Sequence, residues 1–467
     1  MTGPAATPPL AANREFRLLW TGEGVSALGT MTTAVVLPLL AVTTFDAGPG
    51  WMGLLTAAAW LPYLVVGLPA GAWVDRLDAR RVMIAADLAA ALAVGSVPVA
   101  WLLGRLTLPH LVLAALASGT CAVFFRTAYG AFVPRVVRPE DLDVANGRLF
   151  GTEAAMQVAG PGLGGLLVRV VGGALAVAVD TVSYLVSALC LARMDPARLR
   201  PRVDAPPRTA LRREVADGVR VVARDPFLRF FAAQGALSNF ALTGYQTLLV
   251  LFLVRDLGVG PGRVGLLLAL GSVGGLVGSL VAARLAARSG NARALRWLQL
   301  LAGPAALLVP AAGPGAAAFL VPLGVALVGV GVVGANVVRS AFRQRYVPEH
   351  LLGRTSSASA VLVFGTMPLA GLVAGGLGGT LGLRPTILVM AALQLLTSLL
   401  VLVGPFRRGR DLPTGEATVA VPHEAPRSPA TRRRPLPPPR RGRCVLSRAG
   451  GAAGGRARRR GRRRSRR

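Results

Sequence analysis

The chain has 467 residues, 53% of them hydrophobic and only 16% charged, and it carries a formal net charge of +31. Together with a mean hydropathy of +0.55, this composition excludes an ordinary soluble globular protein. The three Cys and three His residues are too scattered for a disulfide framework or a metal cluster, so no cofactor or metal is expected.

Apolar blocks recur along most of the chain, each about 20 residues or longer, the helix length that crosses roughly 30 Å of hydrocarbon. Because backbone groups in lipid must bond within their own segment, and no strand-like alternation is present, these blocks predict helices. We therefore expect an all-α membrane protein of about twelve transmembrane helices in two six-helix bundles. The predicted spans lie near residues 17–44, 51–74, 82–104, 109–130, 149–170, 173–193, 227–254, 264–287, 294–312, 316–338, 356–380 and 385–404.

Arg residues are concentrated in alternate connections, whereas the connections at 45–50 and 311–315 hold none. Since basic residues near span ends are retained on the cytoplasmic side, both termini are expected to be cytoplasmic. No cleavable signal peptide is expected before the first span. An N-terminal cytoplasmic segment (1–13) is predicted to precede a first six-helix bundle (14–194). A cytoplasmic loop (195–225), with an amphipathic stretch at Leu211 to Arg224, joins it to a second six-helix bundle (226–405). A disordered Arg- and Pro-rich cytoplasmic tail (406–467) follows.

Ionisable residues inside spans are costly in lipid and are expected to face the bundle interior or a water-filled cavity. Burying a carboxylate favours its protonated form, which is the property that a proton-coupling site needs. The candidates for proton or substrate binding are Glu23, Asp87, Arg126, Glu153 and Asp180, with Glu23 and Asp180 leading. The other three lie near the cytoplasmic ends of their spans, where a structural ion pair is the alternative. In the second half, uncharged polar groups join this set at Gln234, Asn239, Gln246 and Asn336.

Between the second and third spans, from Gly71 to Arg81, the chain reads G-A-W-V-D-R-L-D-A-R-R, a dense charged turn between two apolar runs. A carboxylate at Asp75 can interact with helix N-termini and neighbouring Arg residues, and so latch the cytoplasmic side in one conformation. For Arg76, Arg80 and Arg81 the alternative role is to fix the topology of the chain.

The fifth span contains G-P-G-L-G-G at 160–165. Pro161 removes an intrahelical hydrogen bond, and the glycines remove side-chain bulk at Gly160, Gly164 and Gly165. A kink and close packing against a partner helix are therefore expected. Ordinary glycine-mediated packing, with no special role in transport, is the alternative.

A weak internal repeat supports two related halves. R-L-D-A-R after the second span is echoed by R-L-A-A-R at 284–288 after the eighth. R-P-E-D-L after the fourth span is echoed by V-P-E-H-L after the tenth, and each is followed by G-R. Many secondary transporters are built from such repeated halves, with the substrate cavity between them.

With these motifs placed, the chain resembles the major facilitator superfamily over residues 14–405, and within it the drug:proton antiporters and the branch of siderophore and macrolide exporters. The turn at 71–81 matches the family's loop signature, G-x-x-x-D-R-x-x-x-R-R. The run at 160–165 matches the antiporter signature, G-P-x-x-G-G. The resemblance implies a cytoplasmic gate that includes Gly71, Asp75, Arg76 and Arg81, and a span-five region that seals the cavity against proton leak.

The resemblance also implies the function: a secondary active transporter of the bacterial cell membrane that exports a hydrophobic or amphipathic small molecule in exchange for protons by alternating access. The expected partners are that small-molecule substrate, protons and the lipid bilayer, and the protein is expected to act as a monomer. The alternative is a non-transporting membrane sensor or scaffold with the same fold. An enzyme is not expected, because the chain has no nucleotide loop, metal cluster or nucleophile constellation.

The tail from Phe406 onward carries twenty Arg residues against Asp411, Glu416 and Glu424, which is +17 of the net +31. Such a basic segment is drawn to anionic lipid headgroups. Specific nucleic-acid binding is not expected, because the tail has neither interleaved aromatic residues nor a fold. The alternative is a poorly constrained extension with no function.

Overall fold

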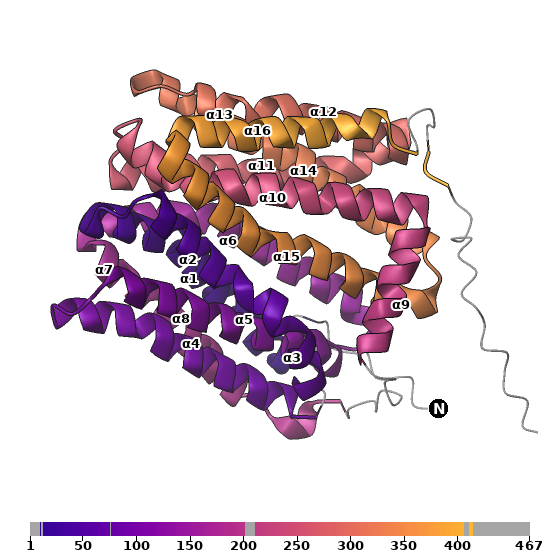
Figure 1. Cartoon of the computed structure of the whole chain (residues 1–467). Helices are drawn as coiled ribbons and strands as arrows, with labels where there is room; N and C mark the ends of the chain where they lie inside the picture. The colour runs from indigo at the N-terminus through magenta and orange to yellow at the C-terminus, as the bar shows by residue number, and fades with distance from the viewer. Residues whose placement is uncertain (1–9, 11–12, 75, 201–210, 406–410, 414–467) are drawn as a thin grey trace, which may run out of the picture. The chain divides into compact units, whose positions relative to one another are not determined.

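The computed structural model describes residues 10, 13–74, 76–200, 211–405 and 411–413. Within these ranges the chain forms helices and no strands (Figure 1), which confirms the predicted all-α class. Up to residue 200 the helices are α1 (Arg14–Phe45), α2 (Pro49–Val65), α3 (Gly67–Val74), α4 (Ala79–Leu102), α5 (Leu108–Val136), η2 (Pro139–Asp141), α6 (Leu142–Val171), α7 (Gly173–Ala176), α8 (Ala178–Ala192) and η3 (Pro196–Arg198). From residue 211 they are α9 (Leu211–Arg224), α10 (Pro226–Arg255), α11 (Pro261–Ser289), α12 (Asn291–Ala306), α13 (Leu308–Ala311), η4 (Gly315–Phe319), α14 (Leu320–Tyr346), α15 (Glu349–Leu381), α16 (Leu383–Leu399) and η5 (Leu400–Leu402).

Eleven helical segments in the described ranges are long and apolar enough to cross a membrane, where about twelve spans were predicted. The difference lies in the second span, 51–74, which is divided into α2 and α3 at Val66. Pro69 has no N–H to bond the carbonyl of Val65, so a regular helix cannot run through this point. With 17 residues, α2 alone reaches only about 25 Å.

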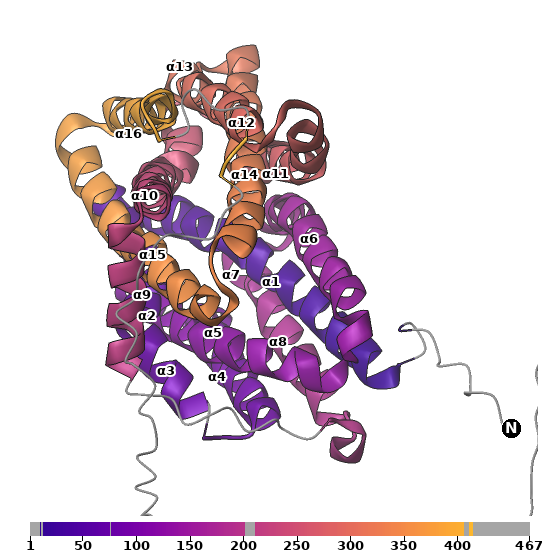
Figure 2. The ribbon, with the colours of Figure 1, turned by 90° about the vertical axis from the view of Figure 1, so that its right-hand side faces the viewer.

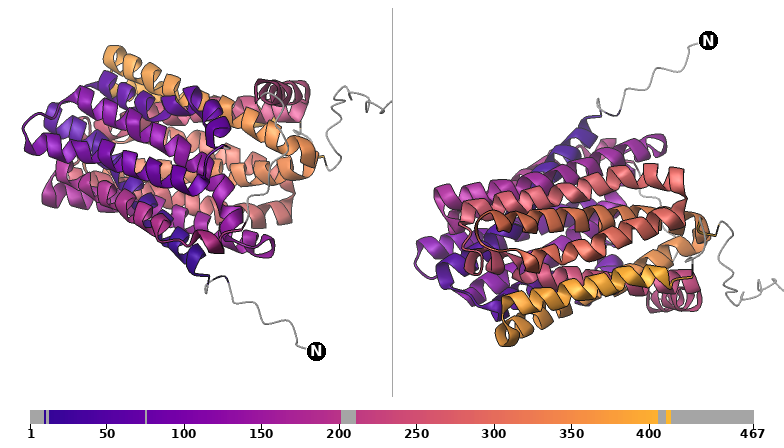
Figure 3. Two further views of the ribbon diagram at one scale, coloured as in Figure 1. Left: turned by 90° about the horizontal axis from the view of Figure 1, so that it is seen from below. Right: turned by 90° about the horizontal axis from the view of Figure 1, so that it is seen from above.

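The long helices run alongside one another when viewed from below or above (Figure 3). Helix α9 lies across their ends, against α10 and α15 (Figures 1 and 2). Its bounds coincide with the predicted amphipathic stretch, and Val221 and Val222 are buried. Most of the predicted tail lies outside the described residues. At 411–413, which are described, Asp411 accepts a hydrogen bond from the backbone N–H of Asn291 at 3.0 Å.

The buried apolar residues form one cluster shared by the two halves of the chain and further clusters confined to one half. The shared cluster surrounds the ends of the helices next to the connections at 45–50 and 255–260, and it includes Leu39, Leu40, Leu248, Phe252 and Ala374. At the opposite ends of the helices, one cluster holds Phe16, Met83, Phe132 and Leu191, all before residue 200. A separate cluster there holds Leu228, Leu295, Phe342 and Tyr346, all after residue 210. The two halves are thus packed together at one end and have separate cores at the other.

Asp225 joins the start of α10 to the end of α14, and it is only 3% exposed. Its Oδ1 accepts hydrogen bonds from the backbone N–H groups of Phe227 and Leu228, both at 2.9 Å. Its Oδ2 accepts a hydrogen bond from the Tyr346 hydroxyl at 2.8 Å. One carboxylate therefore caps a helix and satisfies a buried hydroxyl on another.

We expect Asp225→Ala to lower the free energy of unfolding by about 1–3 kcal/mol, because it leaves buried donors without acceptors. The measurement is the midpoint of thermal unfolding of the detergent-purified protein. Asp195→Ala is the matched control, since the Asp195 side chain is 43% exposed, caps the short helix η3 and pairs with the exposed Arg198. An equal loss of stability in both variants would contradict this assignment.

Candidate functional site

A pocket in the first half of the chain brings together four of the five predicted proton or substrate residues. Glu23 reaches it from α1, Asp87 from α4, Arg126 from α5 and Glu153 from α6. Phe125 and Tyr184 also line it. The pocket thus lies among helices that are far apart in the sequence.

The pocket has more carboxylates than cations, and only some of their oxygens have described hydrogen-bond partners. Arg126 forms an ion pair with Glu153, with Nη2 and Oε1 separated by 3.4 Å. The buried Oε2 of Glu23 and Oδ2 of Asp87 have no hydrogen-bond partner among the described residues. A buried carboxylate without a partner is unfavourable unless it is protonated or meets a cation. The arrangement can therefore hold protons or the cationic part of a solute.

Asp180, a leading candidate from the sequence, lies beside this pocket and is not one of its lining residues. It is 1% exposed, and its Oδ1 accepts a hydrogen bond from the Ser183 hydroxyl at 3.2 Å. It packs against α1, where a Cβ added at Gly29 would lie 2.7 Å from the same oxygen. The hydroxyl groups of Thr30 and Tyr184, 3.2 Å apart, connect the same two helices. The structure thus places Asp180 in the α1–α8 interface.

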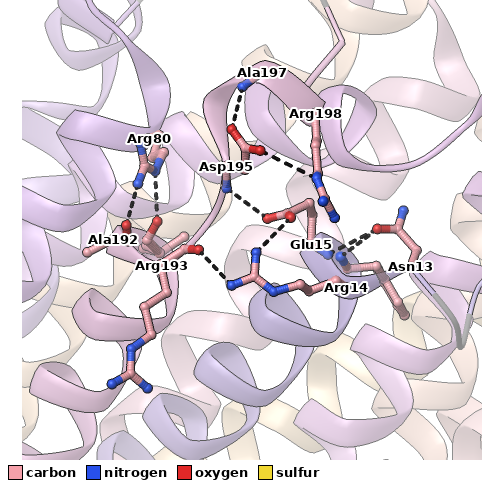
Figure 4. Close-up of polar contacts among 11 residues, drawn as sticks. Asn13, Arg14, Glu15, Arg80, Ala192, Arg193, Asp195, Ala197 and Arg198 are labelled. Atoms are coloured by element: carbon pink, nitrogen blue, oxygen red, sulfur yellow. Dashed lines mark hydrogen bonds and ion pairs between the residues drawn. The ribbon is translucent and has the colours of Figure 1, made fainter.

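Arg80, one of the predicted gate residues, joins the start of α4 to the end of α8 (Figure 4). Its Nε donates to the carbonyl of Leu191 at 2.7 Å and its Nη2 to the carbonyl of Ala192 at 2.6 Å. The last carbonyls of a helix lack intrahelical donors and carry partial negative charge, so a guanidinium is a favourable cap there.

The remaining predicted gate residues lie on or near α3 and α4. Gly71 is in α3, and the side chains of Arg76 and Arg81 are exposed. Asp75 lies outside the described residues, so its role as a latch stays a prediction. Asp78 is the cap at the start of α4, since its Oδ1 accepts a hydrogen bond from the backbone N–H of Arg81 at 3.2 Å.

A polar network next to Arg80 was not predicted from the sequence (Figure 4). Glu15 is 3% exposed; its Oε2 accepts from the backbone N–H of Asp195 at 3.1 Å, and its Oε1 pairs with Arg14 at 3.2 Å. Asn13 caps α1 through Oδ1 and donates through Nδ2 to the carbonyl of Val136, at the end of α5. An Asn followed by an acidic residue just before an apolar run is a helix-start signal from which the cap at Asn13 could have been predicted.

The span-five motif lies where α6 meets α1 and α11, and its four residues are buried: Gly160, Pro161, Gly164 and Gly165. The Thr32 hydroxyl donates to the carbonyl of Gly160 at 3.3 Å. A Cβ added at Gly164 would lie 3.0 Å from the carbonyl oxygen of Thr32, and one at Gly165 would lie 2.7 Å from the Cα of Gly265. Sequence reasoning missed Gly265, although the spacing of glycines along α11 is typical of close helix packing.

Two polar contacts join the halves at the same end as the shared core. Arg255 Nη2 donates to the backbone carbonyl of Asp46 at 2.9 Å and also pairs with its carboxylate. Asp46 has a φ of 47°, in the left-handed region that Asp tolerates better than most residues. The Thr247 hydroxyl donates to that of Thr56 at 3.1 Å. Both contacts link α10 to the region around α1 and α2.

Comparison with known proteins identifies the family of the chain. The family model of the Major Facilitator Superfamily matches residues 19–371 and, in a second match, residues 235–448. Multidrug efflux pump Tap from Mycolicibacterium fortuitum is 28% identical over 376 residues, which cover 77% of this chain and 88% of that protein. Macrolide efflux protein A from Streptococcus pyogenes is 22% identical over 358 residues, covering 76% and 87%.

Among solved structures, a bacterial homologue of the iron transporter ferroportin in the inward-facing state is similar, with a TM-score of 0.65 and 20% identity. The match covers 84% of this chain and 98% of that one. This likeness supports the fold. Because the family model matches well over half of its residues, the chain belongs to the Major Facilitator Superfamily, and it is a multi-pass transporter of the bacterial cell membrane, not an enzyme.

Proposed function

We propose that this transporter exports a hydrophobic or amphipathic small molecule, such as a drug, macrolide or siderophore-like compound, in exchange for protons. The observation that carries the proposal is the pocket in which carboxylate oxygens of Glu23 and Asp87 are buried without described hydrogen-bond partners. Such groups can bind a proton in one conformation and release it in another. The relatives named as multidrug and macrolide efflux proteins support export and this substrate class.

In this proposal, residues 14–194 and 226–405 move relative to each other to give alternating access. The shared apolar core joins the halves at the ends next to the Arg-free connections, while separate cores lie at the opposite ends. Under the positive-inside rule the joined ends face outward. The described arrangement would then be open toward the cytoplasm.

Each motif has a part in this cycle. The span-five glycines let α6 and α11 meet and close the outer side of the cavity. The turn at 71–81 would latch the cytoplasmic side in the opposite conformation, with Asp75 as the central carboxylate and Arg80 holding α4 to α8. The protein would act as a monomer, with its basic tail near anionic lipid headgroups.

Cells that express the chain are expected to export members of a panel of macrolides, hydrophobic cationic dyes and siderophores. A protonophore should reduce export to the level of cells without the protein, because the driving proton gradient is gone. Asp75→Asn, which removes the proposed latch, should also lower the initial rate. If a well-expressed protein moves no solute in the panel, the sensor or scaffold alternative is favoured instead.

A further inference from the structure

Arg339 is a half-buried cation in the second half of the chain that none of the predicted roles includes. The predicted tenth span ended at residue 338, but α14 continues to Tyr346. Arg339 therefore lies seven residues, or about 10 Å, inside the end of a membrane-length helix. A partly buried charge on a membrane-spanning helix is costly, and it indicates a functional site unless a counter-charge neutralises it.

The described contacts of Arg339 are with neutral amides. Its Nη2 donates to Oε1 of Gln234 at 2.9 Å, and its Nη1 donates to Oδ1 of Asn336 at 3.1 Å. Gln234 is itself held by donating to the carbonyl of Thr397 at 3.0 Å, so its oxygen is fixed toward the guanidinium. The Nε of Arg339 is buried without a hydrogen-bond partner among the described residues. A guanidinium has five N–H donors, and these two contacts leave most of them available.

Among the described residues, the surroundings of Arg339 add positive charge, and no ion pair to a carboxylate neutralises it. Arg343, one helical turn further along, also has a buried Nε without a described partner. Asp225 lies against the same helix, but its carboxylate is occupied by the cap of α10 and by the Tyr346 hydroxyl. The first half of the chain shows the reverse imbalance, since the pocket there holds three carboxylates and one Arg, and one oxygen each of Glu23 and Asp87 has no described hydrogen-bond partner.

We propose that Arg339, oriented by Gln234 and Asn336, binds a carboxylate or similar anionic group of the exported solute. Asn336 is exposed, so the Nη1 edge of the guanidinium borders accessible space while its Nε edge is buried. A planar guanidinium held on one edge presents its remaining donors to a carboxylate in the paired geometry that such groups favour. The inference rests on the proposed function, because it names the charge pattern of that same solute: a cationic part for the carboxylate pocket and an anionic part for Arg339.

Two dyes that differ at one group test this inference. Rhodamine 110 carries a free carboxylate, and rhodamine 123 is its methyl ester, so both present the same xanthene ring system. We expect the purified full-length protein in detergent to bind rhodamine 110 about tenfold more tightly than rhodamine 123, as measured by fluorescence anisotropy. Arg339→Gln should remove the preference while retaining the binding of rhodamine 123.

Arg345→Gln is the matched control, because it removes the same charge from an exposed position on the same helix. It should keep the preference. If Arg339→Gln does not fold, Arg339→Lys serves as the second variant; it keeps the charge but loses the planar fork, and a reduced preference is expected.

Equal binding of the two dyes by the wild type, or no binding of either, overturns the inference. An equal loss of binding of both dyes in the folded Arg339 variants also overturns it. That is the result expected if the side chain only stabilises the packing of α14 against α10. A carboxylate preference without protonophore-sensitive export of any solute would support the anion site and overturn the proposed efflux function. Protonophore-sensitive export of both dyes, together with equal binding affinities for them, would support the proposed efflux function and overturn the anion site.

Discussion

Gly165→Leu is expected to abolish export, because it prevents the close approach of α6 and α11. A Cβ alone at this position would lie 2.7 Å from the Cα of Gly265 and 2.9 Å from its backbone nitrogen. No side-chain rotation relieves a clash with backbone, so the helices must separate. Overpacking usually costs about 1–3 kcal/mol, which lowers the population of the joined arrangement by roughly 5- to 150-fold.

The measurement is the initial rate of export per unit of membrane-inserted protein. Gly265→Leu, on the facing helix, should have the same effect, and Gly165→Ala a smaller one. Gly151→Leu is the control, since it adds the same bulk to α6 at a position where no atom lies within 4 Å of an added Cβ. A comparable loss of export in Gly151→Leu would show that bulk on α6, and not the contact with α11, is responsible.

The second large effect is expected at the carboxylate pocket. Glu23→Gln and Asp87→Asn should each reduce proton-driven export by at least about tenfold, because an amide cannot bind and release a proton at these positions. Transport of the solute down its own concentration gradient does not need to be driven by protons, so both variants should retain it. The comparison of the two modes in proteoliposomes, with and without an imposed pH gradient, separates a coupling defect from a folding defect.

Asp143→Asn is the matched control, since Asp143 is an exposed acid in the first turn of α6. It should leave both modes unchanged. Asp180→Asn should affect both modes together, because Asp180 lies in the α1–α8 interface and not on the pocket wall. If both pocket variants keep full proton-driven export, Glu23 and Asp87 are not the coupling groups.

The sequence identified four charged members of the pocket, and their surroundings came from the structure. The cost of burying charge in lipid pointed to all five candidates, since that cost depends only on residue type and on position within a span. The ranking put Asp180 beside Glu23 and placed Asp87 lower. The tertiary structure places the two residues differently, because Ser183 and Gly29 enclose Asp180 whereas Asp87 keeps a buried, unsatisfied oxygen in the pocket.

Two features were misjudged because a local pattern was interrupted. The second span was expected as one helix, but Pro69 removes the donor that would continue α2 into α3. The tenth span was ended before its first Arg, whereas α14 continues past Arg339, whose guanidinium donates a hydrogen bond to Gln234 on another helix. Hydropathy along the chain contains no information about such a partner.

The sequence by itself determined the membrane location, the all-helical class, the family and the glycine motif of span five, since each follows from residue type and spacing along the chain. Only the tertiary structure decided which carboxylates share a pocket, that Gly165 meets Gly265, and that Arg339 has neutral partners. The physical reason is that close approach and hydrogen-bond satisfaction depend on atoms from helices distant in the chain. Those distances are set only when the helices pack.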